Sequence, residues 1–99
     1  MPADVNVQHR PDLRRFTADV GGGDEAVLAY QELSDGTLDL QHTVVPAAAR
    51  GGGVGSALVR AAVDYARQHH VKLVPTCPYV EAWAKRHPGE AGVFEGAGA

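Results

Sequence analysis

Apolar and polar residues alternate along the first half of the chain, as they do in strands with one buried face. The alternation covers three segments, residues 13–20, 25–33 and 37–45. Glycine-containing turns separate these segments at residues 21–24 and 34–36, and such turns suit tight hairpins. The pattern therefore predicts three consecutive strands in a largely antiparallel sheet.

The third segment has a clear two-sided pattern. Its inward face is expected to carry Leu38, Leu40, His42 and Val44. Pro46 follows and ends the strand, because proline cannot donate a hydrogen bond to a neighbouring strand.

The spacing then changes to that of a helix. Apolar residues recur at intervals of three and four from Val54 to Tyr65, which predicts a long helix with one buried stripe. The apolar run 71–75 predicts a fourth strand, and a strand that follows a helix favours parallel pairing with an earlier strand. Residues 78–87 predict a second helix with Pro78 at its first position. The order β-β-β-α-β-α indicates a mixed α+β fold, a twisted sheet with helices packed on it.

The composition limits the classes of function. With 99 residues the chain is expected to form one domain over residues 1–99, with flexible ends at 1–10 and 91–99. A net charge of −3 argues against a broad nucleic-acid surface, and no apolar run suits a signal peptide or a membrane span. Cys77 is the single cysteine, so no intramolecular disulfide can form. We therefore expect a cytoplasmic protein, a monomer or weak dimer, without a bound metal.

Four glycines lie directly before the long helix: Gly51, Gly52, Gly53 and Gly55. A helix N-terminus leaves about four N–H groups without partners and carries a partial positive charge, so it binds anions. Glycines keep these amides accessible to a phosphate, and Arg50 adds a charged donor. The alternative is a flexible connector. Ordering these glycines loses conformational entropy, however, and a ligand contact would offset that loss.

Two common phosphate motifs do not fit this loop. A Walker loop needs lysine and then serine or threonine after its last glycine, where this chain has Ser56 and Ala57. The dinucleotide pattern GxGxxG fails as well, because its third glycine position is not glycine in either register. The pattern that remains is Arg-x-x-Gly-x-Gly, formed by Arg50, Gly53 and Gly55.

Two longer stretches resemble one family. HTVVPAAARGGGVGSALV (residues 42–59) looks like the acetyl-CoA-binding motif of the GNAT N-acetyltransferase superfamily, and VPTCPYVEAWAKRHPGE (74–90) is similar to its minimal single-domain, YjdJ-type branch. The resemblance implies strands that splay apart, with acetyl-CoA between them and an amine as the acetyl acceptor. The loop amides would hold the CoA pyrophosphate and the third strand edge would pair with pantetheine. The implied CoA-binding residues are Thr43, Val44, Val45, Arg50, Gly51, Gly52, Gly53, Val54, Gly55 and Ser56.

Three side chains are candidates for catalysis. Cys77 precedes Pro78 and is expected to lie extended at the start of the second helix, where a thiol pKa is lowered; the alternative is a small buried apolar residue. His42 is a candidate base, or a hydrogen-bonded core histidine. If His42 and Cys77 lie at the tips of adjacent strands, they can act as base and nucleophile. The resemblance gives Tyr79 the role of protonating the departing CoA thiolate, while packing on the helix start is its alternative.

These residues support three functions. The first is an acetyl-CoA-dependent N-acetyltransferase, by direct attack of the amine or through an acetyl-Cys77 intermediate. The second is a CoA-binding or interaction module without turnover, and the third is a small scaffold whose glycine loop is structural. Larger members of the superfamily often place a glutamate base where this chain has the apolar Val44 and Val45. The resemblance therefore leaves the general base open.

Overall fold

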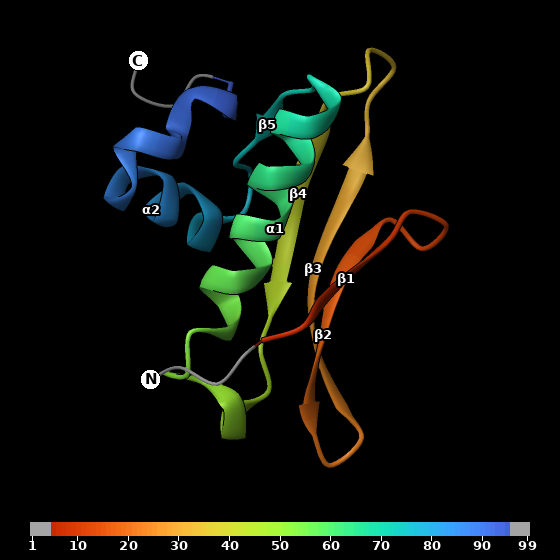
Figure 1. Ribbon diagram of the computed structural model, residues 1–99, viewed down its shortest axis with the longest axis vertical. Helices are drawn as coiled ribbons and strands as arrows, with labels where there is room; N and C mark the ends of the chain where they lie inside the picture. The colour runs from red at the N-terminus through yellow and green to blue at the C-terminus, as the bar shows by residue number, and fades with distance from the viewer. Residues whose placement is uncertain (1–4, 96–99) are drawn as a thin grey trace.

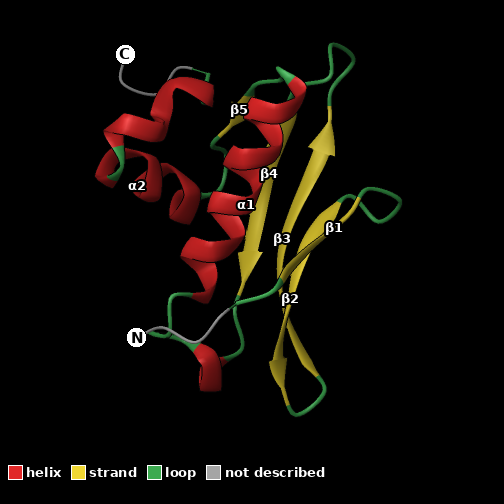
Figure 2. Cartoon of the chain, in the orientation of Figure 1, coloured by secondary structure: helices red, strands yellow, loops and turns green. Residues whose placement is uncertain are grey.

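One sheet and two α-helices form the part of the chain that the structure describes. This structure is a computed structural model, and it describes residues 5–95. The five strands lie in chain order across the sheet, and both α-helices lie on one side of it (Figure 1, Figure 2). The elements in chain order are β1 (Val7–Arg10), β2 (Arg15–Gly21), β3 (Asp24–Glu32), β4 (Leu38–Val44), the 3-10 helix η1 (Ala47–Ala49), α1 (Val54–His69), β5 (Leu73–Val74), α2 (Pro78–Arg86) and the 3-10 helix η2 (Pro88–Val93).

Neighbouring strands are antiparallel, except that β4 and β5 are parallel. α1 connects this parallel pair, because parallel neighbours need a crossover rather than a hairpin. The predicted mixed α+β fold with a largely antiparallel sheet is confirmed. One further strand, β1, precedes the predicted order.

The sheet and helices share one hydrophobic core. α1 packs against β1, β2 and β3, while α2 packs against β4 and α1. Ala26, Leu28 and Tyr30 of β3 are buried, and so are Val54, Leu58 and Ala62 of the apolar stripe on α1. Trp83 places the largest buried side chain of α2 in this core. None of the helices within residues 5–95 is long and apolar enough to cross a membrane.

The N-terminal side of the sheet is more ordered than the sequence predicts. Residues 7–10 form β1 instead of a flexible end, and they pair with β2. His9 explains this order, because its ring stacks on Phe16 with centroids 4.3 Å apart. Its Nε2 is also 2.6 Å from the hydroxyl oxygen of Tyr30, a hydrogen-bond distance.

The C-terminal side also differs from the expected flexible end. Phe94 is buried and forms a bridge to Leu73 of β5. The N–H of Glu95 donates to the carbonyl of Leu73 at 2.8 Å, which fixes this segment beside the sheet. The remaining parts of the expected flexible ends, 1–4 and 96–99, lie outside the described residues.

A bulge interrupts the pairing of β4 with β3. Leu40 pairs with Tyr30, and His42 pairs with Ala29, so Gln41 has no partner in the register between them. An extra residue in one strand disrupts the ladder locally and shifts the side chains beyond it to the opposite faces.

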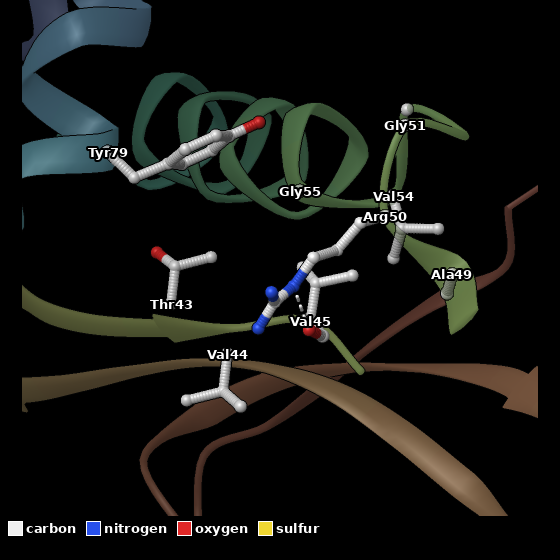
Figure 3. Close-up of a pocket in the computed structure, with 10 residues that line it drawn as sticks. Thr43, Val44, Val45, Ala49, Arg50, Gly51, Val54, Gly55 and Tyr79 are labelled. Atoms are coloured by element: carbon white, nitrogen blue, oxygen red, sulfur yellow. Dashed lines mark hydrogen bonds between the residues drawn. The ribbon is translucent and has the colours of Figure 1, made fainter. Parts of the chain in front are cut away.

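The bulge changes which residues of β4 face the core. Leu38 and Leu40 are buried as predicted, but His42 is exposed and Val44 is 58% exposed. Thr43 points to the helix side instead, opposite to Val44 (Figure 3). The prediction that all four alternate residues share the inward face is therefore wrong beyond Leu40.

Candidate functional site

β4 and β5 separate after a short contact. They pair over residues 38–39 and 73–74. Pro75 then lacks the N–H that a longer ladder would need, and the Cys77 N–H makes a further link by donating to the Leu40 carbonyl at 2.8 Å. Among the described residues, the edge of β4 beyond Leu40 has no strand partner on this side.

A pocket of about 540 Å³ lies beside this unpaired edge. Figure 3 shows it between the end of β4, the loop before α1 and the start of α2. The structure brings together eight of the ten predicted CoA-binding residues here, and adds Ala49 and the candidate catalytic residue Tyr79. The lining residues are Thr43, Val44, Val45, Ala49, Arg50, Gly51, Gly53, Val54, Gly55 and Tyr79.

The start of α1 presents backbone amides to this pocket. Gly53 precedes the helix with φ +84°, a conformation that glycine adopts without strain. No side chain caps this helix end, and its first turn has no acidic residue. The partial positive charge of the helix end is therefore not neutralised within the helix. Since Gly53, Val54 and Gly55 all line the pocket, this wall suits an anion.

Tyr79 lines the pocket beside the start of α1, against which its ring packs closely (Figure 3). A Cβ atom at Gly55 would lie 2.7 Å from the Tyr79 hydroxyl oxygen and 2.9 Å from its Cζ. Glycine is therefore needed at this position for the close approach of the ring. Tyr79 is 38% exposed and lines the pocket.

Arg50 lines the pocket between the loop before α1 and the end of β4 (Figure 3). Its Nε donates to the carbonyl oxygen of Val45 at 3.1 Å, as the dashed line in Figure 3 shows. The side chain is exposed, and its guanidinium retains further N–H donors for an anion.

Cys77 occupies its predicted place immediately before α2. Its backbone is extended, and Pro78 is the first residue of the helix. The thiol is 6% exposed, and its Sγ lies 3.5 Å from the hydroxyl oxygen of Thr43. Cys77 is not part of the pocket lining, so Thr43 separates the thiol from the pocket while touching both.

Two opposing effects set the pKa of the Cys77 thiol. Burial alone raises it. The Thr43 hydroxyl and the first-turn N–H groups of Val80 and Tyr79 favour the thiolate more strongly, so the thiol pKa is lowered overall.

His42 does not meet Cys77. The bulge places His42 on the exposed side of β4, whereas the residue in contact with Cys77 is Thr43. The hypothesis of a His42–Cys77 pair required both side chains on one face, and the structure does not bring them together. No sequence signal marks the bulge, because the alternation in LDLQHTV is uninterrupted.

Two predicted CoA-binding residues lie outside the pocket lining. Gly52 lines a smaller hollow that Val5, Asp19 and Val20 also line. The hydroxyl oxygen of Ser56 accepts a hydrogen bond from Nε1 of Trp83 at 2.8 Å. The indole N–H of a buried tryptophan usually has a partner, and Ser56 is that partner for Trp83.

Comparisons with known proteins agree with this geometry. A family model described as GCN5-related N-acetyl-transferase matches residues 15–93. The chain belongs to this family. Protein NATD1 from Xenopus tropicalis is 38% identical to it over 85 residues, which cover 85% of this chain and 78% of the relative. Protein NATD1 from Homo sapiens is also 38% identical over 85 residues, covering 85% of this chain and 75% of the relative.

A solved structure shows the same fold. The solution NMR structure of a GCN5-like protein from Staphylococcus aureus has a TM-score of 0.70 to this chain. The match covers 95% of this chain and 91% of that one, at 18% sequence identity, and therefore supports the fold alone. The predicted membership of the GNAT superfamily is confirmed, and acetyl transfer is the chemistry that this family membership supports. The YjdJ-type branch stays a prediction.

Proposed function

We propose that this GCN5-related protein is an acetyl-CoA-dependent N-acetyltransferase that transfers an acetyl group to an amine. The observation that carries the proposal is the pocket between the unpaired edge of β4 and the uncapped start of α1. A strand edge can pair with the amide groups of pantetheine, as it does with an added strand. A helix start binds phosphate groups. CoA carries both kinds of group in one molecule.

The residues of the pocket fit the two parts of CoA. Thr43, Val44 and Val45 supply the strand edge, and Arg50 supplies a cationic donor beside it. The loop and first turn of α1 supply the amides for the pyrophosphate, from Gly51 to Gly55. Gly52 in the loop and Ser56 in the first turn of α1 would contribute backbone N–H groups, although neither lines the pocket.

The proposed chemistry uses few side chains. Acetyl-CoA, as substrate, supplies a thioester. When the amine attacks the carbonyl carbon, a C–N bond forms and the C–S bond breaks. In this proposal Tyr79 donates its hydroxyl proton to the departing thiolate, and a base takes the proton that the amine loses. The low exposure of Cys77 favours this direct attack over an acetyl-Cys77 intermediate.

The general base is a separate part of the proposal. His42 is exposed on the side of β4 away from Thr43 and Cys77, so it would act on an amine that approaches from that side. Water can serve instead. The intact mass of the protein after exposure to acetyl-CoA tests the covalent route. If an acetyl adduct forms on the wild-type chain and Cys77→Ala loses both the adduct and turnover, the acetyl-Cys77 mechanism replaces direct attack in the proposal.

Calorimetric titration of acetyl-CoA tests the binding step. We expect a micromolar Kd, about −8 kcal/mol, with weaker binding of dephospho-CoA and of inorganic phosphate. Arg50→Ala removes a charge at the pocket and should weaken binding. Lys85→Ala removes an exposed charge from α2 outside the pocket lining and should not. No binding to the wild-type chain at millimolar acetyl-CoA would refute the proposal.

The second candidate is a CoA-binding module without turnover. It is favoured by one observation, that Cys77 and His42 lie outside the pocket lining and apart from each other. A panel of primary amines with acetyl-CoA separates the two functions, because the module binds the ligand without releasing CoA. We propose a cytoplasmic location for either function, where a free thiol such as Cys77 stays reduced, and a monomer or weak dimer as the active state.

A further inference from the structure

The two helices of the pocket meet at a small joint, here called the α1–α2 joint, formed by Gly55, Ser56, Tyr79 and Trp83. Tyr79 and Trp83 are four residues apart on α2, so they lie on one face of the helix. Tyr79 packs against Gly55, and Trp83 donates its indole N–H to Ser56. Two consecutive residues of α1 therefore contact one face of α2.

Several contacts hold the Trp83 side of the joint. The side chain is completely buried, and its ring stacks on His87 with centroids 4.0 Å apart and an interplanar angle of 18°. The guanidinium of Arg60 lies over the ring at 5.4 Å from its centroid. The ring cannot turn without losing these contacts, so its N–H points to Ser56 with a fixed direction.

The joint connects the two ends of the proposed site. Ser56 is the third residue of α1, so its own N–H is among the amides without an intrahelical partner at the anion-binding end. On α2, Tyr79 is in the pocket wall, and Cys77 precedes the same helix beside Thr43. A shift of α1 against α2 would thus move the phosphate end of the pocket relative to the thioester end.

We infer that Ser56 and Trp83 are a positioning pair, which holds the phosphate-binding start of α1 in register with the reaction end of the pocket. This inference rests on the proposed function. CoA would be held at two distant points, and a small misplacement of one point can reduce turnover strongly. Neither side chain lines the pocket, so their effect is through the positions of the helices.

Fragment binding tests the pair. The probes are acetyl-CoA and the nucleotide half of CoA, which carries the pyrophosphate without pantetheine. Ser56→Ala keeps the backbone amide, so the Kd of the nucleotide half should change less than about 2-fold. The Kd of acetyl-CoA should rise and kcat should fall, by about 10-fold or more. Ser56→Thr keeps a hydroxyl and should restore most of both values.

A double-mutant cycle with Trp83→Phe adds a second readout. If the hydrogen bond is the cause, the double variant Ser56→Ala/Trp83→Phe should have a Kd and kcat no worse than those of the more affected single variant, because both substitutions remove the same interaction. Trp83 is the single tryptophan of the chain, so its fluorescence reports on the joint directly. Binding of acetyl-CoA should change this emission in the wild-type chain and change it less in Ser56→Ala.

The outcomes separate this inference from the proposed function. If Ser56→Ala weakens the binding of acetyl-CoA and of the nucleotide half equally, Ser56 contacts the phosphate directly and the inference of a positioning pair is wrong. Wild-type affinity and turnover in a folded Ser56→Ala variant would overturn it as well, with the proposed function intact. Absence of acetyl-CoA binding to the wild-type chain would refute the function and the pair together.

Discussion

Replacing Gly55 with alanine tests how closely the pocket depends on the contact between α1 and Tyr79. The added Cβ would lie 2.7 Å from the Tyr79 hydroxyl oxygen, and ordinary contact begins at 3.4 Å. The end of the ring must therefore move by about 0.7 Å or more, the difference between these two distances. Because the ring is partly exposed, it can move outward without disturbing the core.

The magnitudes predict a stable protein with a damaged site. Turning the ring away from its preferred rotamer costs about 1 kcal/mol, while alanine in place of glycine stabilises a helix by about 1 kcal/mol. The free energy of unfolding should therefore change by less than about 1 kcal/mol. The Kd of acetyl-CoA should rise about 10-fold, which is about 1.4 kcal/mol, because the Tyr79 wall is displaced.

Urea denaturation and calorimetric titration measure the two quantities on the same samples. Gly89→Ala is the matched control, since a Cβ there meets no atom within 4 Å. In a Tyr79→Ala background, Gly55→Ala should have little further effect on affinity. Wild-type affinity in Gly55→Ala would refute the reasoning, and so would a loss of several kcal/mol in stability.

Three further predictions concern other parts of the chain. The lowered pKa of Cys77 predicts that its alkylation rate rises at lower pH than for an ordinary thiol. Thr43→Val should move the midpoint of this pH dependence upward, because a hydrogen bond to the thiolate is lost. An unchanged midpoint would exclude that hydrogen bond as a cause of the lowered pKa. Burial, followed by the charge of His69, lowers the pKa of His9 below its ordinary value of 6.5. As the pH decreases below 6.5, the unfolded chain therefore takes up a proton before the folded chain does, and thermal stability should fall. His9→Gln should flatten this pH dependence, and an equally steep decline in that variant would assign the dependence to other groups. Phe94→Ala should lower the free energy of unfolding measured with urea by about 3 kcal/mol, because Phe94 is buried. Leu13 is 52% exposed, so the control Leu13→Ala should change this free energy by less than about 0.5 kcal/mol. Similar effects of the two substitutions would show that Phe94 is not part of the core.

Local patterns predict much of the sheet and both helices. The alternation around Leu28 and the stripe on α1 each have a strong period, and tertiary contacts reinforce it. Pro78 fixes the start of α2 and the extended backbone of Cys77, because its ring restricts both residues. These features depend on neighbours in the sequence, so the sequence is sufficient for them.

Features that depend on distant partners are not predictable in this way. β1 is stable because His9 meets Phe16 and Tyr30 across two other strands. Phe94 is buried because Leu73 is beside it, although its own segment is rich in small residues. The pocket also depends on segments that are distant in the sequence, because it forms where β4 and β5 separate.

The bulge in β4 is the most consequential of these features for the candidate site. Nothing in LDLQHTV distinguishes a regular strand from one with an extra residue at Gln41. The bulge exchanges His42 for Thr43 on the helix side, so the residue next to the thiol differs from the one expected. A hydroxyl thus takes the place of an imidazole as the neighbour of Cys77.

The unpaired edge of β4 also has a consequence for solubility. A bare strand edge can recruit a strand from another molecule and so start aggregation. Here the Arg50 guanidinium donates a hydrogen bond to the Val45 carbonyl oxygen at one end of that edge, and it brings a positive charge to the edge. We therefore expect the same arginine, which we propose to bind phosphate, to reduce self-association of the ligand-free protein. Its loss should make purified protein precipitate more readily, and occupation of the edge by a ligand should counteract this.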